Sequence, residues 1–185
     1  MEGKEEPEMK RMAGAMLALL LLCAGDFACA EVADGGEPED APLMPVISAL
    51  GYSLDFDPDH FVLDCNSGDG DVYWWAPTYG DAERTVPYVC VSARGMSAAR
   101  VLEELRRHAK KGAAETETEL AGAVCPVLTC PSGAEGEGAQ STFVCVPVDE
   151  DASLLVEMRC LTGDGADVGT CMWQLVETLQ VVPAE

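Results

Sequence analysis

Three aspartates at alternate positions lie in the first stretch of this chain that could do chemistry. In "GYSLDFDPDH", Asp55, Asp57 and Asp59 have the spacing of the first ligands of a calcium-binding loop. An EF-hand loop that starts at Asp55 needs Gly at its sixth position and Glu at its twelfth, but the chain has His60 and an Asn there. The stretch therefore favours a turn, because Asp accepts hydrogen bonds from nearby backbone amides and Pro58 fixes φ.

A weaker calcium site is an alternative to this turn. Two further aspartates, Asp69 and Asp71, lie in the acidic stretch "DCNSGDGDVYW". If the strands around them are neighbours, Asp57, Asp59, Asp69 and Asp71 could gather at one end of a sheet and bind calcium weakly. Ordinary solvated turns are the competing interpretation.

Seven cysteines follow the predicted export signal, and an odd number in an exported chain predicts disulfides with one thiol left over. Cys171, among apolar residues of a predicted helix, is the candidate for the free thiol. Cys125 and Cys145 are a reasonable pair if their strands pair across the loop "PSGAEGEGAQ". An anaerobic habitat would instead leave most of the cysteines reduced, as small core residues.

Cysteine ligands for zinc are a further alternative. The four candidates are Cys125, Cys130, Cys145 and Cys160. Their spacing is one C-x4-C pair followed by two isolated cysteines, whereas structural zinc sites usually have two close pairs, so the pattern disfavours zinc. Thioredoxin-like redox chemistry needs C-x-x-C, which the chain lacks.

Nucleophilic catalysis would need His60 or His108 beside a Ser or Cys, since these are the two histidines in the chain. Neither lies near a G-x-S-x-G elbow or a papain-like cysteine, and the chain has no phosphate loop or dinucleotide fingerprint. We therefore expect no enzyme activity and no cofactor. A small hydrolase stays open as an alternative, because 33 acidic residues always permit pairs for glycoside hydrolysis.

Trp74 and Trp75 in "VYWWAP" are the candidates for binding a partner. Adjacent strand residues point to opposite faces, so we expect one of them in the core and the other directed outward. An outward tryptophan could anchor a protein or a carbohydrate, and structural packing is the competing interpretation.

The N-terminus predicts export, because "MKRMAGAMLALLLLCAGDFACA" has a basic start, a short apolar run and an A-x-A arrangement ending at Ala30. We expect a signal peptide at residues 1–30, a disordered acidic linker at 31–45 and a single domain at 46–185. Lipid attachment at Cys29 is the alternative to simple cleavage. With either outcome we expect the protein to be extracellular or at the cell surface. It would contact a membrane only if that lipid were attached.

The net charge of −22 opposes binding to nucleic acid or to anionic lipid. Several of the few cations fall in one predicted helix, where the last four lie near the negative end of the helix dipole. A structural role is therefore favoured over a binding patch for Arg100, Arg106, Arg107, Lys110 and Lys111.

Short alternating runs separated by Gly, Asp and Pro predict strands, and helical periodicity follows Ser97 as N-cap up to Gly112 and again over residues 166–180. We expect "GYSLDF" and "HFVLDC" to form a hairpin. The remaining predicted strands are "DVYWWAP", "PYVCVSA", "ETELAGAVCPVLTC", "STFVCVPV" and "SLLVEMRC". This order predicts an α+β domain, an antiparallel sheet with two main helices packed on it.

The strings "YSLDFDPDHFVL", "YVCVSARGMSAARVLEEL", "TFVCVPVDEDASLLVEMRC" and "VGTCMWQLVETLQV" resemble a largely uncharacterised family of small secreted or lipid-anchored domains from Gram-positive anaerobes. The resemblance spans roughly residues 51–182 and implies an α/β sandwich like that of PsbP, the extrinsic photosystem II protein, with no catalytic residues. We therefore expect a non-catalytic binding or accessory module of the cell envelope, whose partner is an unknown protein or envelope component. A calcium- or zinc-binding structural module is the alternative.

Overall fold

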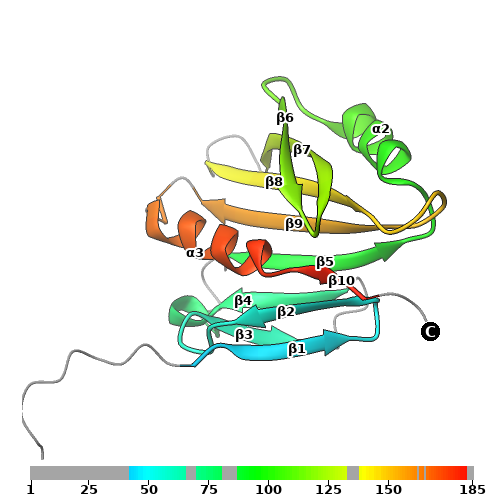
Figure 1. Ribbon diagram of the computed structural model, residues 1–185. Helices are drawn as coiled ribbons and strands as arrows, with labels where there is room; N and C mark the ends of the chain where they lie inside the picture. Colours follow the sequence, from blue (N-terminus) through cyan, green and yellow to red (C-terminus); the bar gives the residue numbers. More distant parts are fainter. Residues whose placement is uncertain are drawn as a thin grey trace, which may run out of the picture. The chain divides into compact units, whose positions relative to one another are not determined.

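The computed structural model describes residues 42–65, 70–80, 87–132, 138–161, 163–164 and 166–182, which belong to one compact unit, Asp40–Glu185 (Figure 1). The first five strands are β1 (Met44–Ser48), β2 (Tyr52–Phe56), β3 (Phe61–Asp64), β4 (Asp71–Trp75) and β5 (Tyr88–Arg94), with a 3₁₀ turn η1 (Ala76–Thr78) after β4. There follow α2 (Ala98–His108), β6 (Ala114–Leu120), β7 (Ala123–Ser132), β8 (Ala139–Pro147), β9 (Ser153–Leu161), α3 (Ala166–Glu177) and β10 (Gln180–Val181).

The predicted α+β class is confirmed, because the described residues form antiparallel sheets with two α-helices packed on them. One sheet has seven strands in the order β3-β4-β5-β9-β8-β7-β6, and the other has three in the order β1-β2-β10. All the strand pairs are antiparallel. The sequence predicted a single sheet and did not separate the small one from the large one.

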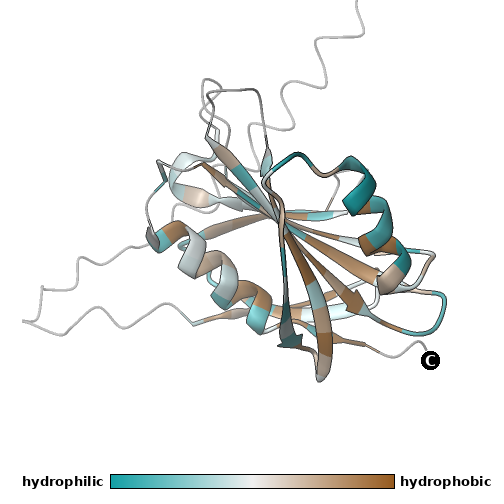
Figure 2. Ribbon diagram, turned by 90° about the horizontal axis from the view of Figure 1, so that it is seen from above, coloured by the Kyte–Doolittle hydropathy of each residue, from teal (hydrophilic) through white to brown (hydrophobic). Residues whose placement is uncertain are grey.

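The main core lies between one face of the seven-stranded sheet and a second layer made of α3 and β2. Tyr52, Leu54 and Phe56 project from β2 into this core because they occupy alternate positions. Alternate residues of β5, β8 and β9 meet them from the large sheet, and α3 adds Met172 and Leu175 among others. Figure 2 shows many apolar residues along the strands that lie between α2 and α3.

A second, smaller core lies on the opposite face of the seven-stranded sheet, under α2. Ala98, Val101 and Leu102 recur at helical spacing and pack on Leu128 and others from β7, β8 and β9. The predicted apolar stripe of this helix is therefore confirmed. The helix ends earlier than predicted, at His108 with an extended Ala109 as C-cap, and Gly112, with a positive φ of 100°, lies in the turn that follows. Ser97 is the N-cap, but its side chain makes no capping hydrogen bond.

Two details of the strand prediction are wrong. β2 and β3 do not form a hairpin, because β2 pairs with β1 and β10 whereas β3 pairs with β4. The turn between them crosses from one sheet to the other, so that apolar residues of both strands face the same core. The run "ETELAGAVCPVLTC" is also two strands, β6 and β7, which reverse at Ala121 and Gly122 with φ of 52° and 75°.

β1 begins at Met44 and so includes the last two residues of the expected linker. The predicted signal peptide at residues 1–30, with Cys29, lies outside the described residues. Among the helices that the structure describes, none is long and apolar enough to cross a membrane.

Candidate functional site

The two tryptophans of β4 point to opposite faces of the sheet, as strand alternation predicts. Trp75 lies on the core side, where its ring stacks on His60 with centroids 5.3 Å apart and meets Phe61 edge-on at 5.6 Å. Trp74 lies on the other face, with the ring of Tyr88 at 5.3 Å and that of Tyr79 at 6.4 Å. Both tryptophans are half-buried.

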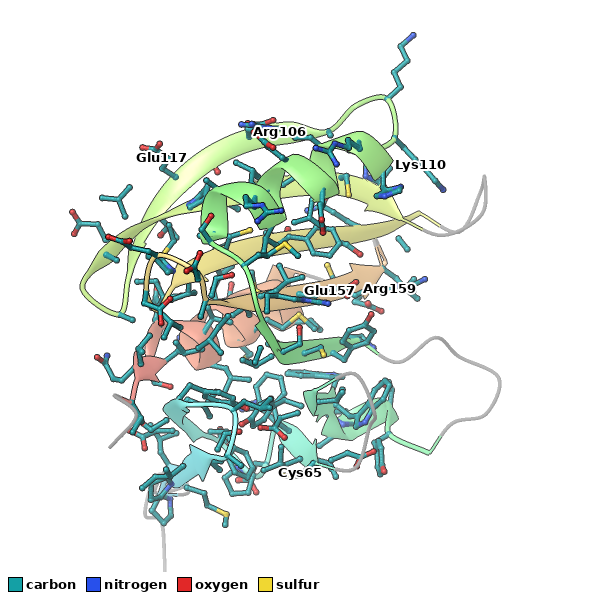
Figure 3. All side chains as sticks on the ribbon, turned by 90° about the vertical axis from the view of Figure 1, so that its right-hand side faces the viewer. Cys65, Arg106, Lys110, Glu117, Glu157 and Arg159 are labelled. Atoms are coloured by element: carbon teal, nitrogen blue, oxygen red, sulfur yellow. The ribbon has the colours of Figure 1, made fainter. Side chains whose placement is uncertain are left out.

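Next to Trp74, a row of polar side chains crosses the face of the large sheet that carries α2. Tyr88 of β5 pairs with Arg159 of β9, and the Tyr88 hydroxyl donates to Oε1 of Glu157 at 3.1 Å. Ser141 donates to the same oxygen at 3.2 Å. Figure 3 shows Glu157 and Arg159 on this face. The row is an ordered polar surface, but its hydroxyl and carboxylate groups largely satisfy one another.

A cleft of about 580 Å³ lies beside α3 on the opposite side of the sheet, and we call it the α3 cleft. Its apolar lining consists of Leu43, Phe61 and Leu175 together with the thiol of Cys171. Its polar lining comes from β2, the β2–β3 turn and α3, and consists of Asp55, Asp57, His60, Gln174, Glu177 and Thr178. An apolar base with a few polar groups is the usual composition of a ligand site.

The predicted Asp57 turn orients the histidine of this cleft. Oδ1 of Asp57 accepts the backbone N–H of Asp59 at 2.8 Å, and its carbonyl accepts those of His60 and Phe61. Oδ2 of Asp57 lies 2.6 Å from Nδ1 of His60, whose ring is fixed from one side by Trp75. The aspartate stretch is thus a turn that presents an oriented imidazole to the α3 cleft.

A catalytic triad needs an oriented histidine beside an acid and, as its third group, an activated nucleophile. The described lining of the α3 cleft offers no such nucleophile. The single hydroxyl proton of Thr178 faces two backbone acceptors, the carbonyl oxygen of Leu175 at 2.8 Å and that of Asp55 at 3.0 Å. Burial, followed by Asp167 and Asp57, raises the pKa of Cys171, which disfavours the thiolate. The other histidine, His108, is exposed at the end of α2.

The aspartates proposed for calcium do not gather. Asp57 and Asp59 follow β2, whereas Asp71 begins β4 and contacts Ser48 and Tyr52 at the opposite end of β2. Asp69 lies outside the described residues. Within the described ranges, no group of three His, Cys, Asp or Glu side chains could hold a metal ion.

Strand alternation excludes a zinc site made of Cys125, Cys130, Cys145 and Cys160. Cys125 and Cys160 face the main core, whereas Cys145 faces the smaller core and Cys130 shares the face of Leu128 beside it. One tetrahedral ion cannot take ligands from both faces of a sheet.

The predicted pair of Cys125 and Cys145 is also not bonded in the structure, where the cysteines from Cys65 to Cys171 are free thiols. β7 and β8 do pair, as the prediction required, but Val127 is opposite Val144, so the two cysteines are one position out of register. A shift of one residue places side chains on opposite faces of a sheet. Both thiols are fully buried, one in each core.

The predicted structural role of the cationic helix agrees with its contacts. Arg106, labelled in Figure 3, donates through Nε to Glu115 of β6 at 2.7 Å, and this contact links the exposed side of α2 to the edge of the sheet. Arg107 lies 3.7 Å from Glu103 on the same helix. Such exposed pairs orient side chains and add little stability.

Sequence reasoning missed the lining that the α3 cleft takes from outside the turn. Leu43 falls in the expected linker, and nothing in the sequence singles out Gln174, Glu177 or Thr178 as site residues. The residues span positions 43 to 178 and share no local motif. A one-turn spacing of Gln174, Glu177 and Thr178 is the one signal that could have marked this face of α3.

No family model and no curated protein matches the chain. Among solved structures it is similar to LpqN, which is involved in cell envelope biogenesis of Mycobacterium tuberculosis, with a TM-score of 0.55 and 16% identity over 76% of this chain and 91% of LpqN. It is also similar to a protein of Bacteroides thetaiotaomicron VPI-5482, with a TM-score of 0.52 and 11% identity over 78% of this chain.

The chain spans half the length of that Bacteroides protein, 50%. A further similarity, with a TM-score of 0.47 and 10% identity over 81% of this chain and 98% of the other, is to CyanoP, the cyanobacterial PsbP of Synechocystis sp. PCC 6803. At 16% and 11% identity, the similarities to LpqN and to the Bacteroides protein are similarities of fold. Membership of the family from Gram-positive anaerobes stays a prediction.

Proposed function

We propose that this protein is an exported, non-catalytic binding module of the cell envelope and that the α3 cleft binds a basic segment of a partner protein. The observation that carries the proposal is the cleft itself. Its volume of about 580 Å³ lies in the range of ligand sites, roughly 300–1,000 Å³. Its base is apolar, and its polar groups come from three separate elements that hold them in fixed positions.

The charge of the lining favours a cationic ligand. Asp55, Asp57 and Glu177 contribute carboxylates, and no Lys or Arg lies among the described lining residues. The net charge of −22 adds a long-range field of the same sign. Because Leu43, Phe61 and Leu175 offer apolar surface beside these carboxylates, the best match is a Lys or Arg next to an aliphatic or aromatic residue.

The arrangement of His60 and Asp57 supports binding without catalysis. A hydrolase of the triad type needs a Ser, Thr or Cys whose proton the histidine can remove. The single hydroxyl proton of Thr178 is taken up by backbone carbonyl oxygens, and the raised pKa of Cys171 keeps it a thiol at neutral pH. His60 therefore acts as a positioned hydrogen-bonding and stacking group for the ligand.

The envelope location rests on the export signal predicted from residues 1–30. The fold shared with LpqN, itself involved in cell envelope biogenesis, is compatible with an accessory role there. A protein partner of this kind would meet the module outside the cytoplasmic membrane.

Selection from a random peptide library displayed on phage, with the purified protein as bait, tests this function. We expect enriched peptides to carry Lys or Arg beside an apolar residue, and calorimetry with one of them to give a measurable affinity. Asp55→Asn, which removes a lining charge without changing shape, should weaken binding about fivefold or more, as the loss of about 1 kcal/mol would.

Asp151→Asn is the matched control, because Asp151 is an exposed acid in the β8–β9 turn, away from the cleft. Equal weakening by both variants would mean that general charge drives binding. Enrichment of acidic or uncharged peptides, or cleavage of a bound peptide, would contradict the proposal.

A further inference from the structure

A second hollow of about 420 Å³ lies on the other side of α3, over the β6–β8 end of the seven-stranded sheet. We call it the threonine groove, because hydroxyl side chains line its floor. Its lining includes Thr116, Thr118, Thr129, Gln140, Thr142 and Trp173.

Strand register brings these threonines together. Thr129 of β7 is directly opposite Thr142 of β8, and their hydroxyl oxygens are 3.2 Å apart. Thr116 of β6 is opposite Val127 and therefore lies on the same face as Thr129, two positions further along β7. The result is a group of hydroxyls on one face of three adjacent strands. Each can donate one hydrogen bond and accept two, so the single contact between Thr129 and Thr142 leaves most of that capacity to a ligand.

Trp173 forms an aromatic wall of the groove. It belongs to α3 and is half-buried, since part of its ring packs against the main core while the rest lines the hollow. Its position is therefore held by packing and does not depend on a ligand. A sugar ring has one face of C–H groups and an edge of hydroxyls, so an aromatic ring beside hydroxyl and amide groups is complementary to it on both counts.

The charged groups of the groove define the ligand further. Glu177 contributes a carboxylate, which accepts hydrogen bonds from hydroxyls, and no Lys or Arg is present in the described lining. This negative charge disfavours phosphate-bearing or other anionic ligands. Gln140 adds an amide that both donates and accepts. We propose that the threonine groove binds a neutral oligosaccharide.

This site is separate from the α3 cleft, although Glu177 lines both hollows from the C-terminal turn of α3. A basic peptide in the cleft and an oligosaccharide in the groove would occupy opposite flanks of the same helix. The module would then hold a protein partner next to a glycan.

Calorimetry of the full protein with pentamers of β-linked glucose and of β-linked N-acetylglucosamine tests the inference. We expect at least one of them to bind, with Thr142→Val weakening it about threefold or more, because Val keeps the shape of Thr but removes one hydrogen-bonding hydroxyl. Trp173→Phe, which keeps an aromatic ring of smaller area, should also weaken binding, and Trp173→Ala should abolish it.

Trp74→Ala is the control, since Trp74 lies on the opposite face of the large sheet and should leave oligosaccharide binding unchanged. Circular dichroism of each variant separates a lost fold from a lost site, and Thr142→Val keeps the test decisive if Trp173→Ala fails to fold. Absence of binding to both pentamers would overturn the proposal. So would binding that Thr142→Val and Trp173→Phe leave intact.

Discussion

The hydroxyl of Tyr52 donates a hydrogen bond of 2.7 Å to Oδ2 of Asp71, and this contact joins the two sheets, because Tyr52 belongs to β2 and Asp71 to β4. Ser48 donates to the same oxygen from the end of β1, and the Tyr73 hydroxyl lies 3.1 Å from that of Tyr52. Asp71 is 8% exposed and Tyr52 fully buried. The aspartate proposed as a calcium ligand is thus the acceptor of a buried network between the sheets.

Removing the Tyr52 hydroxyl should therefore destabilise the protein. In Tyr52→Phe the Asp71 carboxylate loses one of its donors while it stays buried, and we expect the free energy of unfolding to fall by about 1–3 kcal/mol. Urea denaturation at neutral pH measures this. Tyr79→Phe is the control, because Tyr79 is 51% exposed, and a loss no larger than that of the control would show that the network contributes nothing.

The buried tyrosines also predict how stability depends on alkaline pH. Burial is the main cause that raises the pKa of Tyr73 to about 12, and burial with the nearby Glu157 raises the pKa of Tyr88 to about 12. Burial, with hydrogen bonds to Tyr73 and Asp71, raises the pKa of Tyr52 as well. These groups are harder to ionise in the folded state than in the unfolded chain, where tyrosine has its ordinary pKa of about 10.

The stability that they contribute is present below pH 10 and is lost as the pH rises from about 10 to about 12. Urea denaturation across this range should show the unfolding free energy falling, with tyrosinate absorbance rising late in the native protein. Tyr88→Phe should make the fall shallower. Full ionisation of the native tyrosines near pH 10, with stability unchanged, would contradict this.

Local patterns predicted the elements of this fold well, but they could not predict which strands pair. The apolar stripe through Val101 and Leu102 gave α2, and alternation placed Trp74 and Trp75 on opposite faces. Alternation in Leu54 and Phe56 also shows that β2 faces a core. It does not show that its neighbours are residues 44–48 and 180–181, because pairing across long loops depends on the whole chain.

The site was still less accessible to sequence reasoning. The turn at Asp57 was predicted from its own chemistry, and its hydrogen bond to the amide of Asp59 confirms it. The α3 cleft also needs Leu43, which the pairing of β1 with β2 brings near that turn, and Thr178, which the packing of α3 beside β2 brings there. The threonine groove likewise depends on register, which sets Thr129 against Thr142.

Gly70, just before β4, predicts a large effect of a small substitution. Its φ is +151°, and a Cβ built there would lie 2.4 Å from the carbonyl oxygen of Val91 on the neighbouring strand β5. Gly70→Ala must therefore shift backbone, and we expect a loss of about 1–3 kcal/mol by urea denaturation.

Gly169→Ala is the opposite case, because Gly169 lies in α3 with nothing within 4 Å of the added Cβ. Alanine favours a helix over glycine by about 1 kcal/mol, so this variant should be more stable than the natural chain. If Gly70→Ala and Gly169→Ala changed the free energy of unfolding in the same direction, backbone crowding at Gly70 would not be the cause of its effect.

The cysteines give a test of the sheet register itself. Cys125 and Cys145 point into different cores, and burial raises the pKa of both thiols, that of Cys145 to about 11. A short pulse of iodoacetamide at about pH 8 should leave both unmodified in the native protein, because they are neither accessible nor thiolates. Exposed Cys65 should react before them, although burial and two aspartates raise its pKa too. The same pulse in denaturant should modify all three, and mass spectrometry of the peptides reads the result.

A Cys125–Cys145 crosslink in protein purified under oxidising conditions would show that β7 and β8 are shifted by one residue from the register described above, since only that shift brings the two side chains to one face.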